Sequence, residues 1–163
     1  MDRVENPLGI TVLVDYAHTP DALYNVLTAV KPFTSGNLIL VFGCGGDRDP
    51  VKRPIMGKIG REISDVLIVT SDNPRTESPE RIIDKVEKGV FEAGCDEKPY
   101  FRISDRRDAI RRAIEIGMEG DTVVIAGKGH ENYQIIGTKK LPFDDKEEAK
   151  IVIEERVRSG NNA

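Results

Sequence analysis

The chain has 163 residues, of which 39% are hydrophobic and 32% charged, and its formal net charge is -4. This composition is typical of one globular domain with a sizeable core, and its two cysteines are too few for a disulfide framework and indicate a reducing cytoplasm. Because it has neither a basic run nor an apolar stretch near the roughly 20 residues that span a bilayer, we expect it to bind neither nucleic acid nor a membrane.

Short aliphatic runs alternate with amphipathic segments along the chain. The runs predicted as strands cover residues 10–15, 38–42, 66–70, 100–103 and 122–126. The segments predicted as helices cover residues 21–31, 54–63, 79–92, about 105–118 and 144–157. Residues 133–136 and 139–141 predict a short hairpin or a bent antiparallel edge strand. Alternating strands and helices form βαβ units, so the predicted fold class is α/β with a mostly parallel sheet.

Four of the predicted strands end in loops that carry polar residues or glycine. The loops cover residues 15–21, 43–53, 71–76 and 127–131. The carboxyl ends of parallel strands lie along one edge of a sheet, where open α/β proteins bind ligands, so we expect these loops to meet. Loops that served only as connections would not need such chemistry at four strand ends. The sequence therefore predicts a binding site at this edge.

The third of these loops contains Asp72-Asn73-Pro74-Arg75, between a predicted buried strand and a helix start. Pro74 favours an extended backbone at Asn73, which fixes the direction of the Asn73 amide and the Arg75 guanidinium. An Arg side chain can grip a carboxylate through two parallel hydrogen bonds. The loop is therefore a candidate site for a small substrate that carries a carboxylate. The alternative is a helix-capping loop with a solvated Arg.

The glycine-rich loops leave several interpretations open. Residues 43–49 and Gly127-Lys128-Gly129 suit contact with an anion, but neither matches a Walker A or a dinucleotide-binding pattern. Asp47 and Asp49 could hold Mg²⁺ or simply shape their turn. For Arg53 we favour a structural role, as a salt-bridge partner that stabilises the loop of residues 43–54.

His18 follows a predicted strand and lies near Asp15 in the sequence. It could act as a general base, pack its ring against a ligand or cap the next helix. No Ser/His/Asp or Cys/His order argues for covalent catalysis, so we assign no catalytic residue and no metal ligand. These residues taken alone predict an α/β ligand-binding domain, and they do not identify a reaction.

Taken in order, the motifs resemble the C-terminal domain of the Mur ligases. They are Val14–Asp21, Phe42–Asp49 with Lys52-Arg53-Pro54, Asp72–Arg75 and Gly127–Glu131, and the resemblance extends from about Val4 to Arg156. The Asp-Asn-Pro-Arg form is similar to that of the family members that attach meso-diaminopimelate to UDP-N-acetylmuramoyl-L-alanyl-D-glutamate in peptidoglycan synthesis. The resemblance implies a Rossmann-like sheet with helices on both faces, which closes over ATP and brings in the amino acid.

The resemblance also implies roles for individual residues. Asp15 matches the family's ATP-ribose ligand, and His18 matches a residue at the adenosine end. The positions that match the amino-acid pocket are Arg48, Asp72, Asn73, Arg75, Gly127 and Glu131. Meso-diaminopimelate has a distal carboxylate that lysine lacks; Arg75 would pair with it, while Glu131 would hold the neighbouring ammonium. Lysine would leave the buried Arg of such a site unpaired, so the site would reject lysine by several powers of ten.

In that family an N-terminal domain binds the UDP part, and a central P-loop domain holds ATP and Mg²⁺ for the step that forms an acyl phosphate. No Walker A sequence occurs here, so we expect residues 1–158 to be the C-terminal domain alone, followed by a frayed tail at 159–163. Arg3 does not align with a functional Arg that the family places ahead of this domain, and we expect no turnover from the chain alone. The alternatives are a related ligase that adds lysine or glutamate and a non-catalytic nucleotide-binding module.

Overall fold

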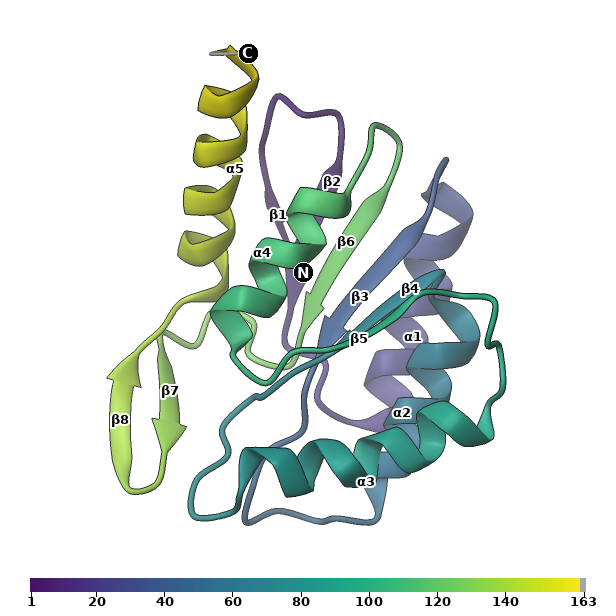
Figure 1. Cartoon of the computed structure of the whole chain (residues 1–163), viewed down its shortest axis with the longest axis vertical. Helices are drawn as coiled ribbons and strands as arrows, with labels where there is room; N and C mark the ends of the chain where they lie inside the picture. The colour runs from purple at the N-terminus through teal and green to yellow at the C-terminus, as the bar shows by residue number, and fades with distance from the viewer. Residues whose placement is uncertain (162–163) are drawn as a thin grey trace.

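The main sheet has the strand order β1-β2-β6-β3-β4-β5 (Figure 1). Its strands are β1 (Asp2–Val4), β2 (Thr11–Asp15), β3 (Leu38–Phe42), β4 (Val66–Val69), β5 (Tyr100–Arg102) and β6 (Thr122–Ala126). In the computed structural model, which describes residues 1–161, β1 runs antiparallel to β2 and all other neighbours are parallel. The predicted strands and the predicted α/β class are confirmed. Strand β1 was not predicted, because only Val4 of its three residues is buried and the segment has no strand pattern.

α-Helices cover both faces of the sheet. α1 (Pro20–Val30), α2 (Lys52–Ile63) and α3 (Pro79–Glu92) pack on one face, and α4 (Arg106–Ile116) and α5 (Asp145–Asn161) pack on the other. Successive strand residues point to opposite faces, so each face has its own apolar core. In the described part of the chain, no helix is both long enough and apolar enough to cross a membrane.

The carboxyl ends of four adjacent strands lie level with one another. Ala126 at the end of β6 is in register with Asp15 of β2 and with Phe42 of β3, and Phe42 is in register with Val69 of β4. The four polar loops predicted from the sequence therefore start at one edge of the sheet, in the spatial order β2, β6, β3, β4. This arrangement confirms that the loops meet.

The predicted hairpin is present as a separate two-stranded sheet. It consists of β7 (Tyr133–Ile136) and β8 (Lys139–Pro142), which pair antiparallel and extend away from the body below α5 in Figure 1. A two-stranded hairpin is marginally stable alone. Backbone bonds join this one to the loop after β4: Arg75 N donates to Ile135 O at 3.0 Å, and Gly137 N donates to Arg75 O at 2.7 Å.

The last helix extends beyond its predicted end at about Val157, because α5 continues to Asn161, into the tail that was predicted to be frayed. Gly160 costs a helix only about 1 kcal/mol relative to Ala, and no proline stops the helix there. The last two residues of the predicted tail, 162 and 163, lie outside the described part of the chain.

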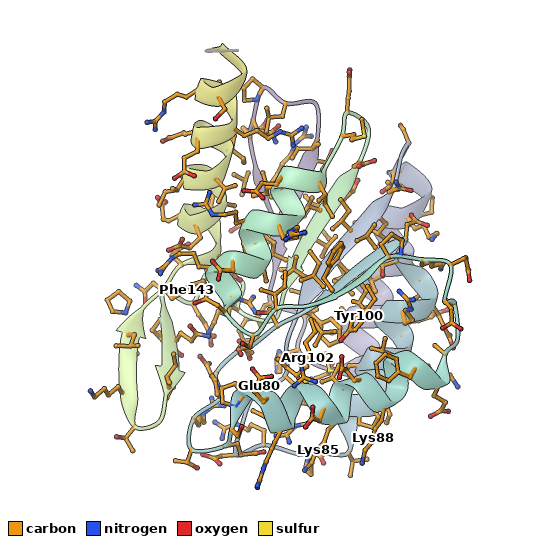
Figure 2. The ribbon with its side chains drawn as sticks, viewed as in Figure 1. Glu80, Lys85, Lys88, Tyr100, Arg102 and Phe143 are labelled. Carbon is orange, nitrogen blue, oxygen red and sulfur yellow. The ribbon has the colours of Figure 1, made fainter. Side chains whose placement is uncertain are left out.

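The edge strand β5 is joined to α3 by polar side chains. Figure 2 shows Arg102 and Glu80 close together between these elements; Arg102 Nη2 lies 2.7 Å from Glu80 Oε2. Arg102 Nη1 also lies 2.6 Å from Glu87 Oε1, and the Tyr100 hydroxyl donates to Glu87 Oε2 at 2.7 Å. Several carboxylates around one planar guanidinium form a network, which holds the short strand at the sheet edge.

A buried ion pair joins the two helices on the opposite face. Arg106, the first residue of α4, and Asp145, the first residue of α5, are both fully buried, and Nη2 lies 2.6 Å from Oδ2. The same guanidinium donates to the carbonyls of Ser71 at 3.0 Å and Ala126 at 3.2 Å. Burial lowers the pKa of Arg106, but the charge and hydrogen bond of Asp145, together with the charges of Asp72 and Glu131, more than offset this and leave the pKa raised. Arg106 thus connects the ends of β4 and β6 to both helices.

Removing one member of this pair leaves a buried charge without its partner. We expect Arg106→Met to lower the free energy of unfolding by about 3–5 kcal/mol, measured by urea denaturation followed by circular dichroism. The matched control is Arg107→Met, which breaks the exposed Arg107–Glu148 pair between the same two helices and should cost less than about 1 kcal/mol. Equal losses in the two variants would contradict the structural importance of the buried pair.

Candidate functional site

A cavity of about 470 Å³ lies at the carboxyl edge of the sheet, where the four loops meet. We call it the edge cavity. Its lining residues are Tyr16, His18, Thr19, Gly43, Cys44, Gly45, Arg48, Asp49, Lys52, Asp72, Asn73, Arg75, Gly127, Glu131 and Tyr133. The structure therefore brings together every candidate site residue except Asp15, from segments that are up to 113 positions apart, His18 to Glu131.

Asp15 lies beside the edge cavity rather than in its wall. Its Oδ2 accepts a hydrogen bond from Ala17 N at 2.8 Å, and its carbonyl accepts from Gly127 N and Gly129 N at 3.0 and 3.1 Å. The ring of His18 is exposed, and its Nδ1 lies 2.9 Å from the Tyr16 carbonyl oxygen. Among the described residues no hydrogen bond joins His18 to Asp15, so the geometry does not favour the general-base interpretation.

Close backbone contact explains the glycines of residues 43–49. A Cβ added at Gly43 would lie 2.3 Å from the Thr70 carbonyl oxygen, and one at Gly46 would lie 1.8 Å from the Pro74 carbonyl oxygen. Gly46 N also donates to Asn73 O at 2.8 Å. The two loops can approach this closely only without side chains at these positions. The glycines pack the loop after β3 against the loop after β4, and they need no phosphate to explain them.

Arg53 joins the loop after β3 to the loop after β4 through Glu77. Its side chain is buried, and its two terminal nitrogens donate to Glu77 Oε2 and Oε1 at 3.0 and 2.8 Å. Glu77 Oε1 also accepts from Asp47 N, while the Asp47 carboxylate accepts from Thr76. The hydrogen bond from Arg53 and that from Asp47 lower the pKa of Glu77 to about 2. The predicted structural roles of Arg53 and Asp47 are thereby confirmed.

Arg75 has an unusual backbone that the hairpin holds in place. Its φ is +53°, in the left-handed region, which costs a residue with a Cβ roughly 1–2 kcal/mol. The backbone bonds to Ile135 and Gly137 offset this cost, and Arg75 Nη1 donates to the Gly46 carbonyl at 3.0 Å. The guanidinium is thus oriented at the cavity wall, with further donors available to a ligand.

Lys128 lies in the interior of the protein, although its position between two glycines suggested contact with an anion. Its ammonium is buried and does not line the edge cavity, so the anion-contact interpretation is wrong for this side chain. It donates to Asn73 Oδ1 at 2.7 Å and to the Tyr133 carbonyl at 2.9 Å. Burial lowers the pKa of Lys128, while the nearby Asp72 carboxylate works in the opposite direction. No motif in the sequence distinguished this buried lysine from an exposed one.

The edge cavity carries charges of both signs. Its walls include the cationic side chains of Arg48, Lys52 and Arg75, and the acidic side chains of Asp49, Asp72 and Glu131. The Asp72 Oδ1 atom is buried and accepts no hydrogen bond from the described residues. Glu131 raises the pKa of the neighbouring Tyr133 hydroxyl. This arrangement suits a ligand that carries both carboxylate and ammonium groups.

The fold and the cavity define an α/β domain of the Rossmann-like type, with a polar cavity where its parallel strands end. The chain belongs to the Mur ligase family: the model for "Mur ligase, glutamate ligase domain" matches residues 1–129.

Two relatives share the name UDP-N-acetylmuramoyl-L-alanyl-D-glutamate--2,6-diaminopimelate ligase. The one from Clostridium botulinum is 55% identical over 93% of this chain and 29% of its own length, and the one from Thermosynechococcus vestitus is 53% identical over 96% and 31%. A solved structure of a ligase with that name superposes with a TM-score of 0.90 at 44% identity, over 96% of this chain and 31% of its own. The chain thus spans about a third of the length of these relatives.

The depressed pKa of Glu77 predicts how acid weakens the site loops. Because the folded pKa of about 2 lies below the ordinary value of 4.5, the stability that Glu77 contributes is fully present above about pH 4.5 and is lost as the pH falls towards about 2. We expect Glu77→Gln to be less stable than the parent at neutral pH, with the difference shrinking across this window. Urea midpoints measured at several pH values, with exposed Glu62→Gln as the control, check this. A pH-independent difference would be evidence against the Arg53–Glu77 linkage.

Proposed function

We propose that the chain is the amino-acid-binding domain of an ATP-dependent ligase that adds meso-diaminopimelate to UDP-N-acetylmuramoyl-L-alanyl-D-glutamate in peptidoglycan synthesis. The observation that carries the proposal is the edge cavity, whose walls hold cations and acids at the positions that the resemblance assigns to the amino-acid pocket. The printed names of relatives more than 50% identical over nearly the whole chain support the same activity.

In this proposal the edge cavity recognises the distal end of the amino acid. Arg75 and the Asn73 amide bind the distal carboxylate, since both residues line the cavity and carry N–H donors. Glu131 and Asp72 bind the neighbouring ammonium. Arg48 lines the cavity and is exposed, so it can meet a carboxylate, and Gly127, with φ +120°, lets the ligand approach the backbone.

ATP is proposed to meet the chain beside the edge cavity. The Asp15 carboxylate is partly exposed and can accept a hydrogen bond from a ribose hydroxyl, and the exposed rings of Tyr16 and His18 offer surfaces for a purine. The described residues contain no cluster of three or more His, Cys, Asp or Glu side chains suited to a metal ion. We therefore propose that Mg²⁺ is held with ATP by residues outside this chain.

The proposed role of the chain is positioning rather than bond making. In the reaction, ATP converts the D-glutamate side-chain carboxylate into an acyl phosphate, and the amine of the incoming amino acid displaces the phosphate to form the amide. An amine held in line with the acyl carbon reacts faster because its translational and rotational entropy has already been lost. We expect the edge cavity to supply this orientation, and the UDP-binding and P-loop parts of a complete ligase to supply the rest.

A test joins this chain to the upstream portion of a complete ligase, such as the Clostridium botulinum relative. We expect phosphate release from ATP that depends on both the UDP-linked dipeptide and meso-diaminopimelate, with lysine used several powers of ten less well. Equal use of lysine or glutamate would favour the related-ligase alternative. Nucleotide binding by this chain alone, without any turnover in the joined protein, would favour the non-catalytic module.

The Arg75 side chain is expected to determine the choice of amino acid. Arg75→Asn removes the guanidinium but keeps a residue that tolerates the left-handed backbone. In the joined protein it should lower kcat/KM for meso-diaminopimelate by about tenfold to a thousandfold, the loss of a paired carboxylate contact, with KM for ATP little changed. Arg81→Gln, on the exposed side of α3, is the control. Undiminished use of meso-diaminopimelate by Arg75→Asn would refute the pocket assignment.

A further inference from the structure

All the hydrogen-bonding capacity of Lys128 is directed into the protein. Its Nζ lies 2.7 Å from Asn73 Oδ1, 2.9 Å from the Tyr133 carbonyl oxygen and 3.3 Å from Asp72 Oδ1. An ammonium has three N–H groups and accepts nothing. Asn73 and Tyr133 accept hydrogen bonds from it, the Asp72 carboxylate is its ion-pair partner, and the buried side chain has no surface on the edge cavity.

The contact with Asn73 determines which end of that amide faces a ligand. Asn73 Oδ1 also accepts a hydrogen bond from Ile135 N at 3.0 Å. Lys128 Nζ and a backbone N–H can only donate, so the amide oxygen must face both of them. The Nδ2 group then points the other way, and Asn73 lines the edge cavity. Asn73 is thereby held as a donor at the cavity that Arg75 also lines.

The charge of Lys128 also balances two acids that line the edge cavity. The Asp72 and Glu131 carboxylates lie 3.3 and 3.8 Å from Lys128 Nζ. Asp72 Oδ1 is buried with no hydrogen-bond donor among the described residues, so the ammonium is its nearest compensating charge. Without that charge, two neighbouring carboxylates would repel each other in a poorly solvated place.

We propose that Lys128 is a positioning residue that fixes the polarity of the edge cavity. It holds Asn73 as a hydrogen-bond donor beside Arg75 on the carboxylate side, and it keeps Asp72 and Glu131 in place on the ammonium side. It acts through these residues and touches no ligand. The identity of the ligand, an amino acid with a second carboxylate, rests on the proposed function; the orientation of Asn73 is a property of this chain alone.

The first experiment needs no ligand. In the ¹⁵N-labelled chain, Lys128→Met should shift the side-chain NH₂ signals of Asn73 and bring their mobility close to that of exposed Asn25, whose own signals should stay in place. The control Lys139→Met, on the exposed strand β8, should leave the Asn73 signals unchanged. Asn73 signals that are identical in Lys128→Met and the parent would overturn the proposal, whatever the protein binds.

The second experiment measures KM in the joined protein. Lys128→Met should raise KM for meso-diaminopimelate at least about tenfold, the effect of losing a charge-assisted contact, with KM for ATP within about twofold. Asn73→Asp keeps an oxygen towards Lys128 but turns the cavity-facing donor into an acceptor, so it should fold and raise the same KM by a similar factor. If Lys128→Met does not fold, the KM of Asn73→Asp decides whether the Asn73 amide acts as a donor towards the ligand.

The outcomes separate this proposal from the proposed function. If the joined parent protein does not use meso-diaminopimelate, the proposed function is wrong. The NMR signals of Asn73 would still decide the role of Lys128. If the parent uses meso-diaminopimelate, an unchanged KM in Asn73→Asp, or equal rises in KM for ATP and for the amino acid in Lys128→Met, would overturn the positioning role.

Discussion

The two walls of the edge cavity are fixed relative to each other by one buried guanidinium. Arg106 donates to the carbonyls of Ser71 and Ala126, and Asp72 and Gly127, which line the cavity, directly follow those residues. Burying such a charge costs several kcal/mol unless a partner compensates for it, and Asp145 is that partner. The ion pair therefore connects the packing of α4 and α5 to the spacing of the site loops. The hydrophobic core alone would not set that spacing to the accuracy that recognition of a small ligand requires.

Cations in this domain have two separate roles. Arg53, Arg106 and Lys128 are buried and donate to carbonyl groups and acids within the protein, which orders the loops. Arg48 and Arg75, in contrast, line the edge cavity, where their charge can meet a ligand. Ordering the loops beforehand lowers the entropy that binding must overcome. The sequence shows only that these side chains are basic, whereas the fold determines which are structural.

The strands and helices could be predicted because local patterns determine them. The β-branched runs, the turn prolines and the glycine-rich strand ends mark the elements and the edge that carries the cavity. The ordered motifs contain most of the residues that line this cavity. The short strand β1 was missed because it has one buried residue, and the last turn of α5 was missed because a single Gly is a weak stop. Lys128, Arg106 and Gln134 could not be found, because their roles depend on partners that are distant in sequence, such as Gln134 Nε2 donating to Asp72 O at 2.8 Å.

The most direct test is a crystal structure of the joined protein with meso-diaminopimelate bound. The distal carboxylate should lie within hydrogen-bond distance of both the Arg75 guanidinium and Asn73 Nδ2, with the neighbouring ammonium facing Glu131 and Asp72. A distal carboxylate bound away from Arg75, or an ammonium facing the Asn73 amide, would contradict the polarity of the edge cavity described above.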